Sequence, residues 1–384
     1  MKELGVYVHI PFCKQKCNYC DFISYCDKND LVEKYIEALK QEIKNNIEDV
    51  SKYEISTIYI GGGTPSYIES KYIGEILETI KQKYNISKNA EITIEVNPGT
   101  ATKEKLKNYV EAGINRVSLG LQSCNNNLLK MIGRIHTYEE FLNTYKLARE
   151  VGFKNINVDL MIGLPNQTLD DVKKSLEEII KLKPEHISVY SLIVEEGTPM
   201  EKKIEKGELK LPDEELERKE YWEVKSTLES SEYKHYEISN FAKSGYESKH
   251  NVNCWEQKEY LGFGVAAHSY MNEVRYSNVE HIEEYLKKEM GSEKCEVGSE
   301  GLYTVHEVQN EEDQKKEYML LGLRKIEGVQ ISSFKNKFGC NPIMEFKNEL
   351  NKLVQEKLIE IDLDQIKLTP KGIDLANIVW EEFI

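Results

Sequence analysis

Short stretches of alternating hydrophobic and polar residues run through the first half of the chain, with longer stretches of helical spacing between them. Alternation with a period of two predicts strands, and apolar residues three or four positions apart predict amphipathic helices. The predicted strands cover 5–10, 55–60, 91–96, 115–119, 154–160 and 186–190. The predicted helices cover 31–47, 71–84, 103–112, 138–151 and 169–182. Such alternation gives a parallel sheet covered by helices, so we expect an α/β fold, a partial and open (β/α)6 barrel.

The periodicity weakens after residue 190 and returns near the C-terminus. Helices at 311–325 and 345–355, a hairpin formed by 358–362 and 365–368, and a helix after Pro370 predict a helical, winged-helix-like module. The sequence therefore predicts three parts. These are a barrel at 1–193, a linker region at 194–310 that completes the barrel mouth, and a C-terminal module at 311–384.

Acidic residues outnumber basic ones along the 384-residue chain. There are 51 Lys and Arg against 66 Asp and Glu, a net charge of −15, and the C-terminal module itself has 11 basic and 14 acidic residues. Because phosphate binding requires a surplus of basic side chains, we expect no nucleic-acid partner. No stretch reaches the ~18 apolar residues of a membrane-spanning helix, and the first residues do not resemble a secretory signal. A cytoplasmic location is expected.

Four of the eight cysteines fall close together near the N-terminus, at Cys13, Cys17, Cys20 and Cys26. The others are scattered singly, at Cys124, Cys254, Cys295 and Cys340. Three thiolates at the spacing of Cys13, Cys17 and Cys20 can hold a [4Fe–4S] cluster and leave one iron open, whereas structural zinc takes four ligands. A zinc site completed by Cys26 or His9, and a set of unrelated surface thiols, are the alternatives.

Further polar residues follow the predicted strands, at the sheet edge where parallel folds collect their functional groups. The glycines at 61–63 allow a close backbone approach, so that their amides can bind a ligand, although a simple tight turn has the same pattern. Glu95 and Asp159 each end a predicted strand. Their carboxylates can accept hydrogen bonds from an amine or from ribose hydroxyls, or can cap the next helix instead.

The loop Cys13-x3-Cys17-x2-Cys20 resembles the hallmark of the radical S-adenosylmethionine superfamily. This resemblance implies that the open iron binds the amino and carboxylate groups of S-adenosylmethionine, and that an electron from the cluster can release a 5′-deoxyadenosyl radical. It assigns the cluster to Cys13, Cys17 and Cys20. It assigns cofactor contacts to Tyr7, Tyr19, Gly62, Gly63, Thr64, Glu95, Gln122, Arg134 and Asp159.

Motifs along the whole chain resemble one branch of that superfamily, the oxygen-independent coproporphyrinogen III oxidase-like proteins. They are YVHIPFC at 7–13, GGGTPS at 61–66, DLMIGLPNQT at 159–168, YEISNFA at 236–242, LGFG at 261–264, AHSY at 267–270 and LGLR at 321–324. Two functions occur within the branch. One is oxidative decarboxylation of coproporphyrinogen III, and the other is heme delivery by the HemW chaperones.

Three features favour the heme chaperones. The dehydrogenase pattern has a cysteine where this chain has Phe22, and it follows a long N-terminal extension for which Cys13 leaves no room. The segment HNVNCW at 250–255 resembles the HNxxYW motif of the chaperones, with Cys254 in place of tyrosine. His250 is a candidate heme ligand, with Cys254 as a second, and a packing role for His250 is the alternative.

The resemblance therefore implies a protein that binds heme, a [4Fe–4S] cluster and S-adenosylmethionine, and transfers heme to recipient proteins, respiratory ones among them. It further implies association with a membrane surface and a cluster-dependent homodimer. The first alternative is an enzyme, a coproporphyrinogen III dehydrogenase or a related radical heme-modifying activity. The second alternative is a zinc-stabilised binding module.

Overall fold

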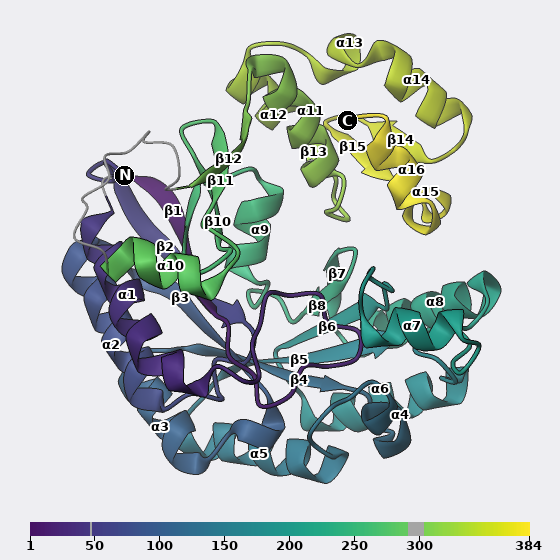
Figure 1. The fold of residues 1–384 in the computed structure, drawn as a ribbon. Helices are drawn as coiled ribbons and strands as arrows, with labels where there is room; N and C mark the ends of the chain where they lie inside the picture. Colours follow the sequence, from purple (N-terminus) through teal and green to yellow (C-terminus); the bar gives the residue numbers. More distant parts are fainter. Residues whose placement is uncertain (47, 291–302) are drawn as a thin grey trace.

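Six parallel strands form the centre of the protein (Figure 1), in a computed structural model that describes residues 1–46, 48–290 and 303–384. Cys295 lies outside these residues. The strands are β1 (Lys2–Ile10), β2 (Tyr53–Gly62), β3 (Ile86–Val96), β4 (Arg116–Gln122), β5 (Asn155–Ile162) and β6 (His186–Ser191). Each pairs in parallel with the next in chain order. The six predicted strands are confirmed.

Helices connect these strands and cover the outside of the sheet (Figure 1). They are α1 (Val32–Asn45), α2 (Ser70–Lys83), α3 (Lys103–Glu111), α5 (Tyr138–Val151) and α6 (Leu169–Leu182), with the short η1 (Asn29–Leu31), η2 (Pro98–Thr100) and α4 (Asn126–Met131). Capping boxes fix the starts of α5, at Thr137 and Glu140, and of α6, at Thr168 and Asp171. The short α4 was missed because six residues are too few to show a helical period.

The region predicted as a linker extends the sheet at both edges. It contains α7 (Pro199–Glu205), α8 (Glu214–Ser230), β7 (Lys234–Glu237), β8 (Asn240–Ala242), α9 (Lys249–Trp255), β9 (Tyr260–Phe263), β10 (His268–Met271), β11 (Val274–Ser277), α10 (Ile282–Met290) and β12 (Thr304–Val308). β8 pairs antiparallel with β6, and β9 pairs in parallel with β1. The resulting twelve-stranded sheet ends in β12 and β7, so the barrel is open as expected.

The C-terminal module has a hydrophobic core of its own. It consists of α11 (Glu311–Gly322), β13 (Val329–Gln330), α12 (Ile331–Phe338), α13 (Pro342–Glu345), α14 (Lys347–Gln355), β14 (Ile359–Asp362), β15 (Gln365–Leu368), α15 (Pro370–Asp374) and α16 (Ala376–Glu381). β14 and β15 form the predicted hairpin, and β13 joins it in a three-stranded sheet. The expected helical module with a small hairpin is confirmed, while the boundaries at 193 and 310 stay predictions.

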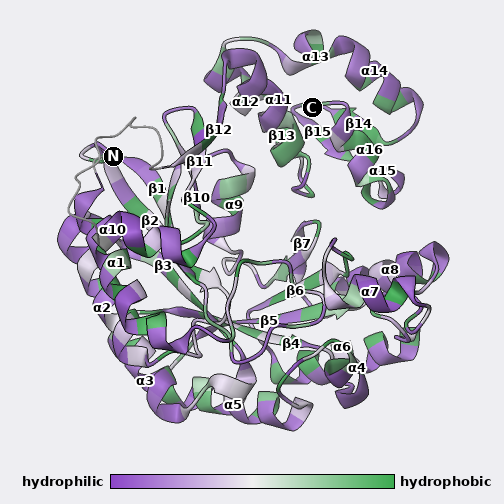
Figure 2. Cartoon of the chain, viewed as in Figure 1, coloured by the Kyte–Doolittle hydropathy of each residue, from purple (hydrophilic) through white to green (hydrophobic). Residues whose placement is uncertain are grey.

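The main core lies between the sheet and its helices. In β1 the alternating residues Leu4, Val6, Val8 and Ile10 are fully buried. Each such side chain stabilises the fold by about 1.5–3 kcal/mol through burial alone. Figure 2 shows the same division along the chain, with apolar strand segments inside and polar helix surfaces outside. Within the described ranges, no helix is long and apolar enough to cross a membrane.

Candidate functional site

The carboxyl ends of the central strands surround a cavity of about 440 Å³, called cavity 1 below. Eleven of the thirteen residues singled out in the sequence line it. They are Cys13, Cys17, Tyr19, Cys20, Gly62, Gly63, Thr64, Glu95, Gln122, Arg134 and Asp159. Parallel strands bring their C-terminal ends to one edge, so residues far apart in sequence meet there.

The cysteine loop follows β1 and is tied down at several points. Cys13 N donates to Tyr25 O at 2.9 Å, and Tyr25 N donates to Pro11 O at 2.7 Å, so the loop folds back on itself. Asn18 joins the loop to the turn after α4, because its backbone N donates to Ile132 O and its Nδ2 to Met131 O. The loop is thus held over cavity 1 without regular secondary structure.

Two side chains donate hydrogen bonds to the thiols of this loop. Thr64 Oγ1 lies 3.3 Å from Cys13 Sγ, and Arg134 Nη1 lies 3.5 Å from Cys17 Sγ. Cys13 is buried, and burial raises its pKa; burial likewise raises the pKa of Cys20 to about 11. Burial favours the neutral thiol of Cys13, whereas the hydrogen bond from Thr64 and a bound iron centre would both favour its thiolate.

The glycines after β2 are required by the cysteine loop itself. A Cβ on Gly63 would lie 2.9 Å from Ile10 O and 3.0 Å from Phe12 N, and a Cβ on Gly62, whose φ is +109°, would lie 2.5 Å from the His9 ring. Gly63 N donates to Ile10 O, and Thr64 N donates to Phe12 O, both at 2.9 Å. Both amides are therefore used within the protein in this conformation, and cofactor contacts of Gly62, Gly63 and Thr64 stay a prediction.

Glu95, near the end of β3, presents a partly buried carboxylate to cavity 1. Tyr59 Oη donates to its Oε1 at 2.8 Å. Burial raises the pKa of Glu95 to about 7, so the carboxyl group changes charge near neutral pH. It can therefore accept a hydrogen bond from an amine or hydroxyl, as the sequence predicts.

Asp159 in β5 is held by neighbours on two strands. Ser118 Oγ donates to its Oδ2 at 3.0 Å, and Asn157 Nδ2 donates to its Oδ1 at 2.7 Å. Burial raises the pKa of Asp159, while these hydrogen bonds act in the opposite direction. The carboxylate lies inside the sheet edge in a fixed orientation, and these partners do not cap a helix.

Arg134 and Gln122 complete this side of cavity 1. Arg134 Nη2 donates to Gly120 O at 2.6 Å, and its buried Nε has no hydrogen-bond partner among the described residues. Gln122, the last residue of β4, has a φ of +75°, an uncommon conformation for a residue with a side chain. The strained backbone turns Gln122 at the strand end, where its side chain lines the cavity.

Tyr7 and His250 lie outside cavity 1. The Tyr7 hydroxyl lies 2.9 Å from His9 Nδ1, and the Tyr7 ring stacks on Tyr59. The His250 ring also stacks on Tyr59, with 5.2 Å between the two ring centroids, and its Nδ1 lies 2.9 Å from Thr57 Oγ1. Both residues therefore contact Tyr59, the side chain that donates a hydrogen bond to Glu95, and neither lines cavity 1.

Three functional positions were not identified in the sequence. Tyr59 orients Glu95 and contacts both Tyr7 and His250, whereas Ser118 and Asn157 orient Asp159. Polar residues at buried positions of otherwise apolar strands were the available signal for all three. A buried hydroxyl or amide needs a partner, and here the partner is a carboxylate of the site.

The donor set fits an iron–sulfur cluster with a bound cofactor better than a zinc ion. Three thiols of one loop share a cavity, and an unpartnered guanidinium Nε is buried beside them. His9 cannot complete a zinc site in this conformation, since its Nδ1 contacts Tyr7 and its Nε2 contacts Ile23 O at 2.9 Å. In the described part of the chain, no three His, Cys, Asp or Glu side chains are grouped around a single-ion position.

Comparisons with known proteins agree with this architecture. Residues 7–179 match the radical SAM superfamily, and residues 309–375 match the HemN C-terminal domain. In the solved structures, coproporphyrinogen III oxidase (HemN) from Escherichia coli, a radical SAM enzyme, has a TM-score of 0.83 at 22% identity, covering 100% of this chain and 90% of that chain. At this identity the likeness shows the fold alone.

Two bacterial relatives are similar over their whole length. The heme chaperone HemW of Bacillus subtilis is 40% identical over 383 residues, covering 99% of each chain. The heme chaperone HemW of Lactococcus lactis is 36% identical over 386 residues, covering 100% of this chain and 98% of the relative. Radical SAM membership implies a [4Fe–4S] cluster and S-adenosylmethionine as cofactors. The resemblance found in the sequence is confirmed: this chain belongs to the HemW family within the radical SAM superfamily.

Proposed function

We propose that this protein is a heme chaperone, which binds heme and transfers it to recipient heme proteins. The observation that carries the proposal is the end-to-end similarity to two proteins named as heme chaperones, at 40% and 36% identity. Similarity over the barrel alone would support only the cofactor chemistry. Here the C-terminal module and the HNVNCW segment are included as well.

In this proposal cavity 1 is the cofactor site. Cys13, Cys17 and Cys20 hold the cluster, which when bound can supply one electron to S-adenosylmethionine. Glu95 and Asp159 accept hydrogen bonds from the cofactor, and Arg134 stabilises the charge of the Cys17 sulfur. Tyr7 acts through Tyr59 and Glu95, as a residue that positions the carboxylate.

One position near the cluster argues against the decarboxylating enzyme. Phe22 occupies the place of the cysteine that follows the dehydrogenase cluster motif, and its side chain is 63% exposed at the rim of cavity 1. An exposed phenylalanine offers an apolar contact and no metal ligand. This rim suits a docking contact for a flat apolar molecule or a partner protein.

The heme ligand comes from α9 in this proposal, with His250 and Cys254 as the two candidates. His250 is 9% exposed, and burial lowers its pKa to about 4, so the imidazole is neutral as an iron ligand requires. Cys254 lines a second cavity, and burial raises its pKa to about 11. The His250→Ala and Cys254→Ala variants distinguish the two candidates, because only loss of the true ligand shifts the heme absorption band. If neither variant shifts the band, neither residue is the ligand.

The remaining expectations concern the cell. We also propose that the protein is cytoplasmic, that its recipients include respiratory heme proteins, that it contacts a membrane surface, and that it forms a homodimer that depends on the cluster. Each has a direct measurement: fractionation, heme transfer, vesicle binding and sedimentation with and without the cluster.

A heme titration tests the proposal. Protein with a reconstituted cluster is titrated with hemin and then mixed with an apo-heme protein, and the Cys17→Ala variant serves as the control without a complete ligand set. We expect saturable hemin binding and transfer to the acceptor. Absence of either from the cluster-loaded protein contradicts the chaperone function.

The enzyme alternative is tested separately under anaerobic conditions. The reconstituted protein receives reductant, S-adenosylmethionine and coproporphyrinogen III. We expect no protoporphyrinogen IX above the amount formed by Cys17→Ala. Formation in proportion to the protein added would overturn the proposal in favour of the dehydrogenase.

A further inference from the structure

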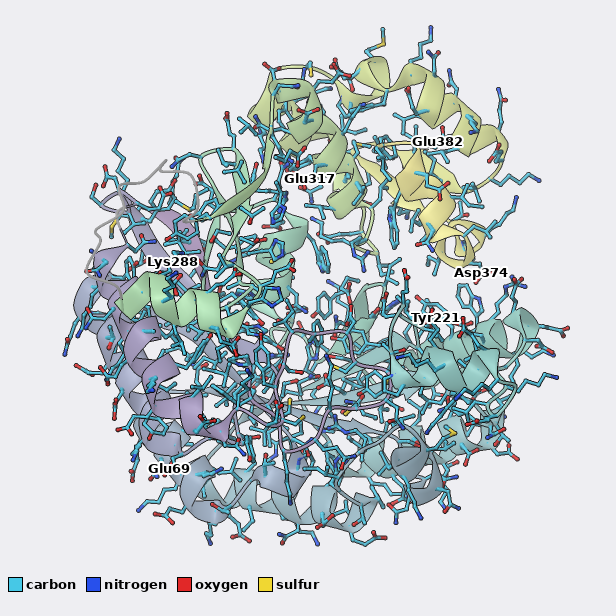
Figure 3. The ribbon with its side chains drawn as sticks, viewed as in Figure 1. Glu69, Tyr221, Lys288, Glu317, Asp374 and Glu382 are labelled. Carbon is cyan, nitrogen blue, oxygen red and sulfur yellow. The ribbon has the colours of Figure 1, made fainter. Side chains whose placement is uncertain are left out.

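A second cavity, of about 930 Å³, lies between the sheet and the C-terminal module and is called cavity 2. Its wall comes from the end of β6, from α8 and α9, from the segment after α11, and from α15 and α16. Figure 3 labels Tyr221 of α8 and Asp374 of α15, which both line this cavity. A volume of this size is typical of sites for cofactor-sized ligands.

Arg324 lies in the wall of cavity 2, between two indole rings. Its Cζ is 4.4 Å from the ring centroid of Trp255 and 4.6 Å from that of Trp380. Trp255 belongs to α9 and Trp380 to α16, so two parts of the chain far apart in sequence meet on one guanidinium. Cation–π attraction to both rings holds the guanidinium in the wall, while its N–H groups remain able to donate hydrogen bonds to a ligand.

The donors of this cluster have no acceptor within the described residues. Arg324 Nε and both indole Nε1 atoms are buried without a hydrogen-bond partner, and no carboxylate lies within ion-pair distance of Arg324. The nearby carboxylate of Glu237 attracts Arg324, but its Oε1 accepts from Ser239 N at 2.9 Å and from Asn240 Nδ2, and within the described residues it forms no hydrogen bond to the guanidinium. Burial lowers the pKa of Arg324 despite the opposing charge of Glu237, so the guanidinium is only partly compensated, and an anionic ligand would reduce the remaining cost of its burial.

The rest of the wall includes apolar side chains that are unusually exposed. Ile193, after β6, is 69% exposed, and Ile378, in α16, is 43% exposed. Both line cavity 2, as do Leu192, Ile238 and Leu375. Exposed aliphatic side chains around a cavity mark a site for an apolar ligand. The ligand therefore combines a carboxylate with a large apolar body.

We propose that cavity 2 binds the porphyrin of heme, with a propionate on the Arg324 guanidinium and the macrocycle against the indole rings and the aliphatic wall. This inference rests on the proposed heme-binding function and names the place of the site. Carboxylates of Glu214, Glu217 and Asp374 line the cavity from α8 and α15, and Glu237 lines it near Arg324. Repulsion from the α8 and α15 carboxylates disfavours a propionate on that side, whereas on the other side the Arg324 guanidinium offers unpartnered donors beside Glu237.

Binding of hemin and of its dimethyl ester, measured on the full chain with a reconstituted cluster, tests the site. Arg324→Gln removes the charge, and we expect it to weaken hemin binding about tenfold or more while changing ester binding by less than about twofold, because the ester carries no carboxylate. Trp255→Phe and Trp380→Phe keep flat rings without the indole donors. We expect each to weaken binding of both ligands by a smaller factor.

Arg218→Gln is the matched control, since Arg218 lines the same cavity but already pairs with Asp374 at 3.4 Å. Equal losses in the Arg218 and Arg324 variants, or an Arg324→Gln loss that is the same for hemin and its ester, would overturn the site. Cluster content and circular dichroism establish that each variant is folded, and Arg324→Lys provides a second variant that keeps the charge. Failure of the wild-type protein to bind hemin refutes the proposed function instead, so the two failures are distinguishable.

Discussion

The carboxylate of Glu42, in α1, is buried outside the functional site, and both of its oxygens accept hydrogen bonds. Gly264 N donates to its Oε2 at 2.8 Å, Tyr285 Oη to the same oxygen at 2.7 Å, and Asn278 Nδ2 to its Oε1 at 2.6 Å. Burial nevertheless raises its pKa from 4.5 to about 7. The hydrogen bonds hold the side chain in place, but they do not offset the cost of burying its charge.

This shift predicts a pH dependence of stability. The folded state binds a proton at Glu42 that the unfolded state releases between pH 4.5 and about 7, so the free energy of unfolding falls as pH rises through this window. The contribution is up to about 1.4 kcal/mol per pH unit. Urea unfolding between pH 5 and 8 should show a slope that is smaller in Glu42→Gln than in the wild type by up to this amount, while Glu95 and Glu220, whose pKa values burial also raises to about 7, contribute the rest. Glu37→Gln, at an exposed position of the same helix, should keep the full wild-type slope, and an unchanged slope in Glu42→Gln would contradict the assignment.

At the scale of elements, the site depends on two loops that meet. The loop after β1 carries the cysteines, and the turn after β2 supports it through the amides of Gly63 and Thr64. An added methyl group at Gly63 meets the backbone of Ile10, Pro11 and Phe12 at 2.9–3.0 Å. Backbone cannot move aside as a flexible side chain can, so the cysteine loop must shift.

We therefore expect Gly63→Ala to lower the free energy of unfolding by about 1–3 kcal/mol and to reduce iron and labile sulfide per chain after reconstitution. Gly74→Ala is the control. Gly74 lies in α2 with no atom within 4 Å of the added Cβ, so this change should stabilise the helix by up to about 1 kcal/mol and leave iron content unchanged. Equal iron content in both variants would show that the contact does not position the cysteines.

The central elements could be predicted from the sequence because each carries its own period. The six strands of the barrel alternate regularly, and their helices have one apolar face. The strands added at the edges, such as β8 (three residues) and β9 (four residues), are too short for a period. Their conformation is decided by pairing with β6 and β1, which is a tertiary contact that the local sequence does not contain.

The residues of the site also divide into those that the local sequence predicts and those whose positions depend on tertiary contacts. Cysteines, glycines and strand-end carboxylates could be predicted, because parallel strands deliver their ends to one edge. His250 could not be placed, since its position follows from packing against Tyr59 and Thr57. The cluster of Arg324, Trp255 and Trp380 was also not foreseen, because three separate segments form it only after the C-terminal module has docked.

At the scale of the whole molecule, Glu317 of α11 attaches the C-terminal module to the extended sheet (Figure 3). Arg275 Nη2 donates to its Oε1 at 2.5 Å, and Gln257 Nε2 donates to its Oε2 at 2.7 Å. Burial opposes the charge of Glu317, yet the hydrogen bond and charge of Arg275 hold its pKa below the ordinary value. A carboxylate that stays charged in a partly buried position indicates a favourable ion pair.

Glu317→Gln should therefore loosen the module. We expect a loss of about 1–3 kcal/mol in the free energy of unfolding, because Arg275 loses the nearer of its two carboxylate partners and keeps only Glu307 at 4.0 Å. Limited proteolysis should become faster in the connection before α11. Glu312→Gln, on the same helix, is the control: its pair with Lys316 is exposed and 3.8 Å long, so its effect should stay below about 1 kcal/mol. Proteolysis at the same rate in both variants would contradict the role of Glu317.

One segment after β6 belongs to both cavities, since Tyr190, Ser191, Leu192 and Ile193 line each of them. A ligand that shifts these side chains in one cavity also reshapes the wall of the other, so the two binding equilibria share a coupling free energy. Such coupling is reciprocal, and the factor by which one ligand changes the affinity of the second must equal the factor in the opposite direction. If heme binds in cavity 2 as proposed, its affinity would then depend on whether the cofactor occupies cavity 1, without any contact between the two molecules.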